Sequence, residues 1–220
     1  SYSRLMLFPY KDDNPAILTP FVTYGIIGIN IFVFLFQLSV ELNDPVSGKS
    51  LIYIFGLVPA DFSIFSVFTS MFMHGGFAHI VGNMWFLWIF GDNIESLLGH
   101  VRYFFFYLTC GIGAAIAQIL IDPSSTIPMV GASGAIAGVL GAYMILYPKA
   151  KVHVFVFFIF ITTIQVPAQI VLGVWFLMQL SNGLGSIGLD LSGGVAWFAH
   201  IGGFIMGIST QKLFRTIRIE

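Results

Sequence analysis

The chain has 220 residues, of which 57% are hydrophobic and only 9% charged, and its formal net charge is −1. A typical soluble domain carries about 25% charged residues, so these side chains cannot cover a water-soluble globule, and the hydrophobic content excludes disorder. The near-neutral balance gives no electrostatic basis for binding nucleic acid, and the single Cys110 excludes an intrachain disulfide. We expect one all-α, multi-pass membrane domain over residues 1–220.

A membrane-spanning helix needs about 20 mostly apolar residues, and the charged residues bound the stretches that qualify. These stretches predict transmembrane helices at about residues 21–40, 77–97, 103–121, 132–147, 167–180 and 195–213. The fourth span is short, at roughly 24 Å by the helical rise per residue. The first is too long for the apolar core of a cleavable signal peptide, so we expect no such peptide.

The connections between these spans are less regular. Residues 41–76 form a long first connection whose apolar stretch 62–73 is too short to span, so we expect it to be interfacial or partly buried. Residues 152–189 allow either one full span with a surface segment or two short spans, and Pro167 favours a break. A flexible loop before the last span is indicated by Gly183, Gly185, Gly188, Gly193 and Gly194.

The positive charges lie unevenly on the two sides that six spans would create. Lys and Arg concentrate in the cytoplasmic loops of membrane proteins. With six spans one side receives only Lys49, and the other receives Arg4, Lys11, Arg102, Lys149, Lys151, Lys212, Arg215 and Arg218. A seventh span would place the cluster after Leu213 outside, so we expect six spans with both termini cytoplasmic. Asp92 and Glu95 are then expected at a solvated inner helix end.

Ser133 begins the short fourth helix, within Gly131-Ala132-Ser133-Gly134. Because this helix starts late from the outer side, Ser133 should lie below the outer surface. There the free N–H groups and positive dipole end of the helix could stabilise an oxyanion. The alternative is packing alone, since Ser133, Ala137 and Gly141 also form a stripe of small residues.

His200 lies about five residues into the last predicted span, also near its outer end. Gly203 and Gly207 follow it as a Gly-x-x-x-Gly pair, which lets two helices approach closely. Packing of this pair on the small-residue stripe would bring His200 against Ser133 as its general base. Alternatively, His200 is a histidine that is hydrogen-bonded inside the bundle.

His79 and Asn83 are four residues apart on the second predicted span, so they share one face near its outer end. Both can donate hydrogen bonds and could bind an oxyanion, or they could simply join helices. The predicted topology places them in the same outer half as Ser133 and His200, which favours one shared site. No acidic residue lies in that layer of the spans, and nothing places Asp190 near it.

Other chemistries find little support in the sequence. It contains no His-Glu-x-x-His segment and no phosphate-binding P-loop, and its five histidines lack acidic companions at ligand spacing. We therefore expect no metal and no cofactor. A transporter or channel is a weaker alternative, because the charges of a coupled relay are missing from the centre of the predicted spans.

Four segments resemble the rhomboid family of intramembrane serine proteases, in order and spacing, over roughly residues 15–213. They are His74-Gly-Gly-Phe-Ala-His79-Ile-Val-Gly-Asn83, Gly91-Asp-Asn-Ile-Glu95, Gly131-Ala-Ser-Gly134 and Ala199-His200-Ile-Gly-Gly203 with Gly207. The resemblance implies a dyad without an acid, with Ser133 as nucleophile and His200 as base. It also implies an oxyanion hole formed by His79, Asn83 and the backbone N–H of Ser133. Close helix packing near the site is expected at Gly131, Gly134, Ala137, Gly141, Gly203 and Gly207.

In this family the long first loop enters the outer leaflet sideways, and the loop before the last span caps a water-filled cavity. The implied substrates are single-span membrane proteins that are cut in or near the outer part of their span at small residues. Two positions depart from the pattern. Phe65-Ser66 stands where some members carry Trp-Arg, and Ala137 stands where some place a Tyr whose ring packs on the base. The support for His200 must therefore come from elsewhere.

The sequence thus predicts an intramembrane serine endopeptidase that acts on single-span proteins in the lipid bilayer, without nucleic acid or metal. We expect it in a prokaryotic cell membrane, with the active site toward the outer side. The alternative is a catalytically silent relative that binds and guides transmembrane clients. Such relatives lack the serine or the histidine, whereas this chain carries both Ser133 and His200.

Overall fold

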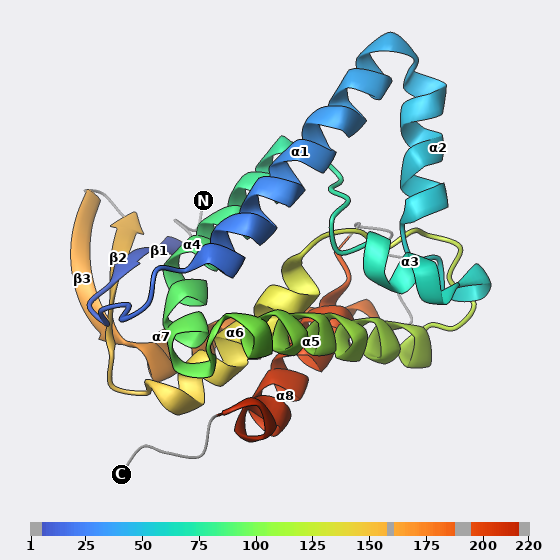
Figure 1. The fold of residues 1–220 in the computed structure, drawn as a ribbon. Helices are drawn as coiled ribbons and strands as arrows, with labels where there is room; N and C mark the ends of the chain where they lie inside the picture. Colours follow the sequence, from blue (N-terminus) through green and yellow to red (C-terminus); the bar gives the residue numbers. More distant parts are fainter. Residues whose placement is uncertain (1–5, 158–160, 188–194, 216–220) are drawn as a thin grey trace.

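The computed structural model describes residues 6–157, 161–187 and 195–215. Helices dominate this part of the chain (Figure 1). The longer ones are α1 (Phe21–Asn43), α4 (Phe77–Leu98), α5 (His100–Ile121), α6 (Ser133–Leu146), α7 (Ala168–Ser186) and α8 (Trp197–Phe214). Each coincides with one predicted span. By length and composition, two helices in the described ranges, α1 and α5, suffice to cross a membrane, and α6 is a shorter apolar helix.

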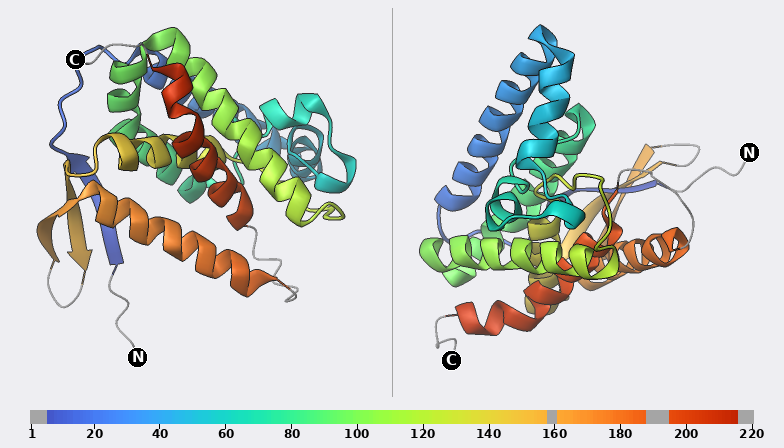
Figure 2. Two further views of the ribbon diagram at one scale, coloured as in Figure 1. Left: turned by 90° about the horizontal axis from the view of Figure 1, so that it is seen from below. Right: turned by 90° about the vertical axis from the view of Figure 1, so that its right-hand side faces the viewer.

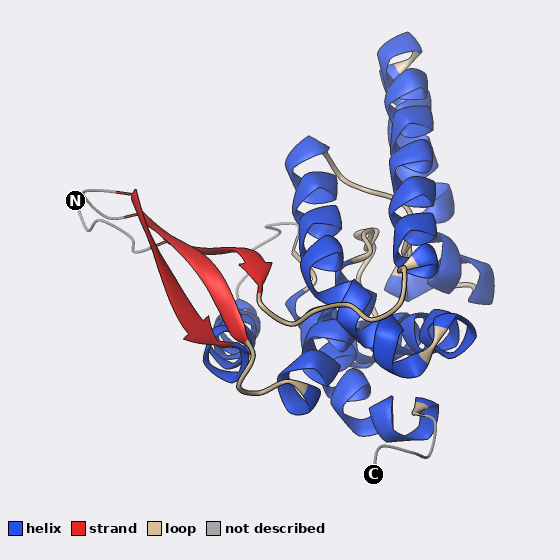
Figure 3. Ribbon diagram, turned by 60° about the vertical axis from the view of Figure 1, so that its left-hand side comes forward, coloured by secondary structure: helices blue, strands red, loops and turns tan. Residues whose placement is uncertain are grey.

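A small antiparallel sheet flanks the helices (Figure 3), so the prediction of an all-α fold was wrong. Its central strand β2 (Lys151–Phe157) pairs with β1 (Met6–Asp12) on one side and β3 (Ile161–Pro167) on the other. The segment Lys-Val-His-Val-Phe-Val-Phe is rich in β-branched and aromatic residues, which favour strands. The described part of residues 152–189 therefore holds strand residues followed by a single helix, α7, and not two helices.

The first connection is more ordered than the sequence predicts. It contains α2 (Pro45–Phe55), the 3₁₀ turn Pro59–Asp61 and α3 (Ile64–Thr69), and α1 and α2 form a hairpin that rises from the bundle (Figure 1). Asp44 begins α2 by accepting a hydrogen bond from the backbone of Val46 at 3.0 Å, as helix-capping aspartates do. The apolar stretch 62–73 contains α3 and is partly buried, as expected.

The loop predicted before the last span is shorter than expected. Gly183 and Gly185 lie inside α7, which continues to Ser186. Gly188, Gly193 and Gly194, together with Asp190, lie outside the described residues.

The carboxylate of Glu95 ties three helix ends together and is fully buried, so the prediction of a solvated helix end was wrong for this residue. It accepts hydrogen bonds from the backbone N–H groups of Val22 and Thr23 at 2.8 and 2.7 Å, and from the Thr23 hydroxyl at 2.7 Å. His100 Nδ1 lies 2.6 Å from the same carboxylate. Glu95 therefore caps the start of α1 and joins it to the end of α4 and the start of α5.

The N-terminal strand is tied to this same end of the bundle. Asp12 accepts a hydrogen bond from the hydroxyl of Tyr143, near the end of α6, and one from the amide of Asn93 at 3.3 Å. Trp85 of α4 donates its indole N–H to the carbonyl of Pro9 at 2.8 Å. Successive helices α1, α4, α5 and α6 therefore alternate in direction between this end and the opposite one.

Helix α6 lies at the centre of the bundle. Its residues from Gly134 to Tyr143 are all buried, and α4, α5, α7 and α8 surround it (Figure 2). Small side chains allow α5, α6 and α8 to pack closely on one another. A β-carbon at Gly138 of α6, for example, would lie 2.3 Å from Cys110 of α5. Because Ser133 is the first residue of α6, the packing that centres this helix also sets the position of Ser133.

Candidate active site

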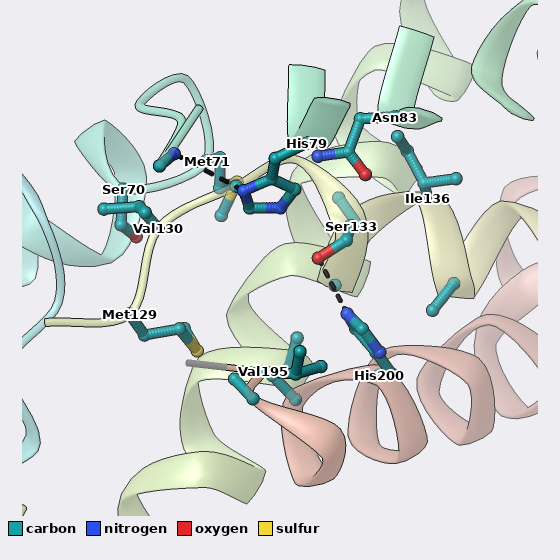
Figure 4. A pocket seen from close by; sticks show the side chains of 18 of the residues that line it. Ser70, Met71, His79, Asn83, Met129, Val130, Ser133, Ile136, Val195 and His200 are labelled. Carbon is teal, nitrogen blue, oxygen red and sulfur yellow. Dashed lines mark hydrogen bonds between the residues drawn. The ribbon is translucent and has the colours of Figure 1, made fainter. Parts of the chain in front are cut away.

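Ser133 and His200 meet at the end of the bundle opposite Glu95. Ser133 is the first residue of α6, and His200 lies in the first turn of α8. Ser133 Oγ lies 2.8 Å from His200 Nε2 (Figure 4), which is hydrogen-bond distance for a serine that gives its proton to an imidazole. The two residues are 67 positions apart, and the structure brings them together as the sequence predicted.

Glycines of α6 and α8 allow this contact. A β-carbon at Gly203 would lie 1.9 Å from the carbonyl oxygen of Gly134, and one at Gly207 would lie 2.0 Å from that of Gly138. The Gly-x-x-x-Gly pair of α8 therefore packs on α6, as expected. The contacting positions differ in part from the predicted stripe, because α8 meets Gly134, Gly138 and Gly141 while Ala137 is fully buried in the core.

His79 is oriented as a hydrogen-bond donor toward this site. The backbone N–H of Gly75 points at His79 Nδ1, 3.4 Å away, so Nδ1 acts as acceptor and the proton resides on Nε2. Gly131 makes room for the ring, because a β-carbon there would lie 2.7 Å from Cε1 and Nε2 of His79. Gly131 also has φ +124°, a conformation that favours glycine.

Asn83 supplies a second donor one turn further along α4. It is only 8% exposed, and its Nδ2 atom is buried without a hydrogen-bond partner in the described structure. The same atom would lie 3.5 Å from a β-carbon at Gly131, so it borders the segment that leads into Ser133. A buried donor that is left unpaired costs free energy, so this N–H group is free to bind an acceptor that enters beside Ser133.

Helix α7 supplies contacts to His200 that the sequence analysis missed. Gln179 Oε1 lies 2.7 Å from His200 Nδ1, and the ring of Trp175 lies 6.0 Å from the imidazole ring. In addition, Trp197 at the start of α8 presents its ring edge-on to the His200 ring, with 6.3 Å between the ring centroids. Gln179, Trp175 and Trp197 therefore hold the imidazole of His200 in place, which the small side chain of Ala137 cannot do. The available signal was an aromatic residue, Trp175, followed four positions later by a polar one, Gln179, on the same predicted helix.

A cavity of about 790 Å³ connects these groups. Its lining includes Ser133, His200, His79 and Asn83, together with Trp175 of α7 and residues from the segments before α4 and α6. Ser133, His200, His79 and Asn83 therefore face one common space.

The remaining predicted positions lie away from this chemistry or outside the description. Phe65 is exposed, and Ser66 is buried in a capping box with Ser63 at the start of α3. Asp190 lies in the loop that is not described. Within the described ranges, no group of three or more His, Cys, Asp or Glu side chains could hold a metal ion.

Comparison with known proteins shows which family this chain resembles. The family model of the Rhomboid domain matches residues 61–216. The chain is 32% identical over 209 residues to Rhomboid protein 1, mitochondrial, of Saccharomyces cerevisiae, covering 91% of this chain and 54% of the relative. It is 29% identical over 192 residues to Rhomboid protease GluP of Bacillus subtilis, covering 86% and 34%. It is 32% identical over 146 residues to RHOMBOID-like protein 6, mitochondrial, of Arabidopsis thaliana, covering 63% and 40%.

The chain thus spans between a third and about half of the length of these curated relatives. The mitochondrial relatives conflict with the expectation of a prokaryotic cell membrane, which is therefore withdrawn. An integral, multi-pass membrane protein remains the consistent description. Because the family model covers most of the chain and includes Ser133, His200, His79 and Asn83, the chain belongs to the rhomboid family.

Proposed function

We propose that this protein is an intramembrane serine endopeptidase that uses Ser133 and His200 as a catalytic dyad. The observation that carries the proposal is the 2.8 Å contact between Ser133 Oγ and His200 Nε2, on a cavity that two candidate oxyanion donors also line. Membership of the rhomboid family supports it, because that family consists generally of intramembrane serine proteases and includes the named protease of Bacillus subtilis.

In the proposed reaction Ser133 Oγ attacks the carbonyl carbon of the scissile peptide bond while His200 Nε2 accepts the hydroxyl proton. The tetrahedral oxyanion receives hydrogen bonds from His79, Asn83 and the backbone N–H of Ser133, which lies unpaired at the start of α6. Collapse of this intermediate transfers the proton from His200 to the leaving amine. Water then hydrolyses the acyl-enzyme by the same steps.

We further propose that the six longer helices each cross the membrane, with both ends of the chain on one side and the dyad toward the other. The alternating helix directions support this topology. Glu95 joins the start of α1, the end of α4 and the start of α5, whereas the Ser133–His200 contact joins the starts of α6 and α8. The distribution of Lys and Arg agrees with it.

The proposed substrates are membrane proteins with a single transmembrane helix, cut near the dyad at small residues. A helical segment must unwind locally before its peptide bond can reach Ser133. Glycine or proline near the cleavage site lowers the cost of unwinding, because both are poor helix formers. The proposal therefore predicts faster cleavage of helices that contain these residues in the half of the membrane that holds the dyad.

The test is gel-based cleavage of a model single-span substrate by purified protein in detergent, with and without a chelator. The proposal predicts cleavage that persists with the chelator and disappears in Ser133→Ala. Inhibition by the chelator that is reversed by zinc would overturn it. Equal cleavage by parent and Ser133→Ala would also overturn it, and would favour a catalytically silent protein that binds and guides transmembrane clients.

A further inference from the structure

Helix α7 presents one buried polar residue to the dyad. Gln179 is 7% exposed, whereas its neighbours Leu177 and Met178 are 61% and 57% exposed. Trp175 lies one turn earlier on the same face and lines the cavity beside Ser133. This face of α7 is therefore directed at His200, while Leu177 and Met178 face away from the protein.

The contact between Gln179 and His200 determines which imidazole nitrogen carries the proton. For His200 Nε2 to accept the hydroxyl proton of Ser133 it must be unprotonated, so the ring proton resides on Nδ1. That N–H needs an acceptor, and the amide oxygen Oε1 of Gln179 lies 2.7 Å from it. The two hydrogen bonds of His200, to Ser133 and to Gln179, are thus mutually consistent.

We propose that Gln179 is the positioning residue of His200, with the Trp175 ring beside the imidazole as its second support; this inference rests on the proposed serine protease function. Gln179 acts through His200 and does not contact the reacting atoms. In a three-residue triad, an acidic group orients the histidine. Here Gln179 and Trp175 together orient His200, a task that an aromatic residue at position 137 could otherwise share.

A neutral acceptor suits this location. A carboxylate at position 179 would have to leave water for a largely apolar surrounding, which is strongly unfavourable unless it is well paired. An amide oxygen accepts the same Nδ1–H bond at a much smaller desolvation cost. It orients the imidazole and selects its tautomer, but stabilises the imidazolium less than a charged acid would.

The packing of α7 on α8 holds Gln179 at this distance. Gly183, one turn beyond Gln179, lies against the first turn of α8, and a β-carbon there would be 3.3 Å from Trp197 and 3.4 Å from Ile201. On the other side of Gln179, Phe176 stacks on Phe204 with ring centroids 4.5 Å apart. Contacts on both sides therefore place Gln179 beside His200.

The experiment measures kcat and KM for a model single-span substrate, across pH, in the parent and four variants in detergent. Gln179→Met removes the acceptor and keeps the side-chain length. Gln179→Asn keeps the amide but is one methylene too short. Gln179→Glu restores an acceptor. Gln169→Met makes the matched substitution at an exposed glutamine of the same helix. Thermal unfolding of each variant reports whether it is folded.

We expect Gln179→Met and Gln179→Asn to lower kcat by about tenfold to a hundredfold at nearly unchanged KM, because the base loses its orientation. Gln169→Met should match the parent. Gln179→Glu should recover kcat at high pH, and the acidic limb of its pH profile should move up by about one pH unit, because a nearby carboxylate stabilises the imidazolium. A merely structural role for Gln179 would not move this limb.

Parent-like kcat in folded Gln179→Met and Gln179→Asn would overturn the inference. So would a Gln179→Glu variant that stays as slow as Gln179→Met at every pH. If Gln179→Met does not fold, the comparison of Gln179→Asn with Gln179→Glu decides. Cleavage by the parent that does not depend on Ser133 would instead contradict the proposed function, so the two failures are distinguishable.

Discussion

Gly203 of α8 packs directly on the backbone carbonyl of Gly134 in α6, so closely that a β-carbon at residue 203 would lie 1.9 Å from the carbonyl oxygen. Gly134 follows Ser133 in the chain, and Gly203 lies one helical turn after His200. The separation of the two catalytic candidates therefore depends on a backbone contact that tolerates no side chain. Atoms cannot be added there without moving one helix.

Gly203→Ala should therefore reduce both stability and activity. The added methyl group must push α8 away from Gly134, which costs about 1–3 kcal/mol for overpacking and lengthens the Ser133–His200 contact. We expect a lower unfolding midpoint in detergent and at least a tenfold loss of kcat. Gly173→Ala in α7 is the matched control, since a β-carbon there meets nothing within 4 Å. Equal behaviour of the two variants would refute the role of the contact.

Asn83→Ala should lower kcat with little change in KM. The Nδ2 donor has no partner in the described structure, so its hydrogen bond forms only when negative charge develops on the substrate oxygen. Loss of one oxyanion donor costs about a hundredfold to a thousandfold in kcat. Steady-state kinetics on a model substrate measures this, with the exposed Asn43→Ala as control. A change confined to KM would mean that Asn83 binds the ground state instead.

Glu95→Gln should destabilise the bundle without directly altering the dyad. The buried carboxylate accepts two backbone N–H groups and the Thr23 hydroxyl, and an amide can replace only part of these contacts. We expect a loss of about 1.5–3 kcal/mol, typical of a hydrogen bond to a charged group. Thermal unfolding in detergent measures it, with exposed Glu41→Gln as the control. Parent-like stability would show that α1 needs no cap from α4.

Acidification should strengthen the attachment of the N-terminal strand through Asp12. Burial, together with the negative charge of nearby Asp92, raises the pKa of this β1 carboxyl from the usual 3.8 to about 6. Since the folded state binds the proton more tightly than the unfolded state, this residue adds stability as the pH falls through 6 toward 4.

The comparison that isolates this effect is the unfolding midpoint at pH 7 and at pH 5 in the parent and in Asp12→Asn. The gain on acidification should be smaller in Asp12→Asn than in the parent. Asp61→Asn, at an exposed carboxylate, serves as the reference. The same gain in all three proteins would show that Asp12 does not carry the pH dependence.

The sequence predicted the long helices and the pair Ser133 and His200 because these features leave local signals. Charged residues bound each apolar run, and Gly203 and Gly207 mark a helix face that packs closely. The relation of His79 and Asn83 to the site followed from their spacing of four residues on one helix.

The features that the sequence analysis missed depend on partners far away in the chain. Two interpretations of residues 152–189 stayed open in the sequence, because hydropathy does not distinguish a β-rich apolar run from a spanning helix. Glu95 is buried because the backbone of α1, some 72 residues earlier, supplies its donors. The sequence alone does not show that Gln179 contacts His200, because this contact depends on how α7 packs in the folded protein.

The proposed function depends on Ser133 being a nucleophile that His200 activates. The most direct measurement is covalent modification by a fluorophosphonate, which reacts with activated serines, read by the intact mass and by mapping the labelled residue in the parent, Ser133→Ala and His200→Ala. We expect a single label on Ser133 of the parent, and none on either variant. A label on another residue, or equal labelling of Ser133 in His200→Ala, would contradict it.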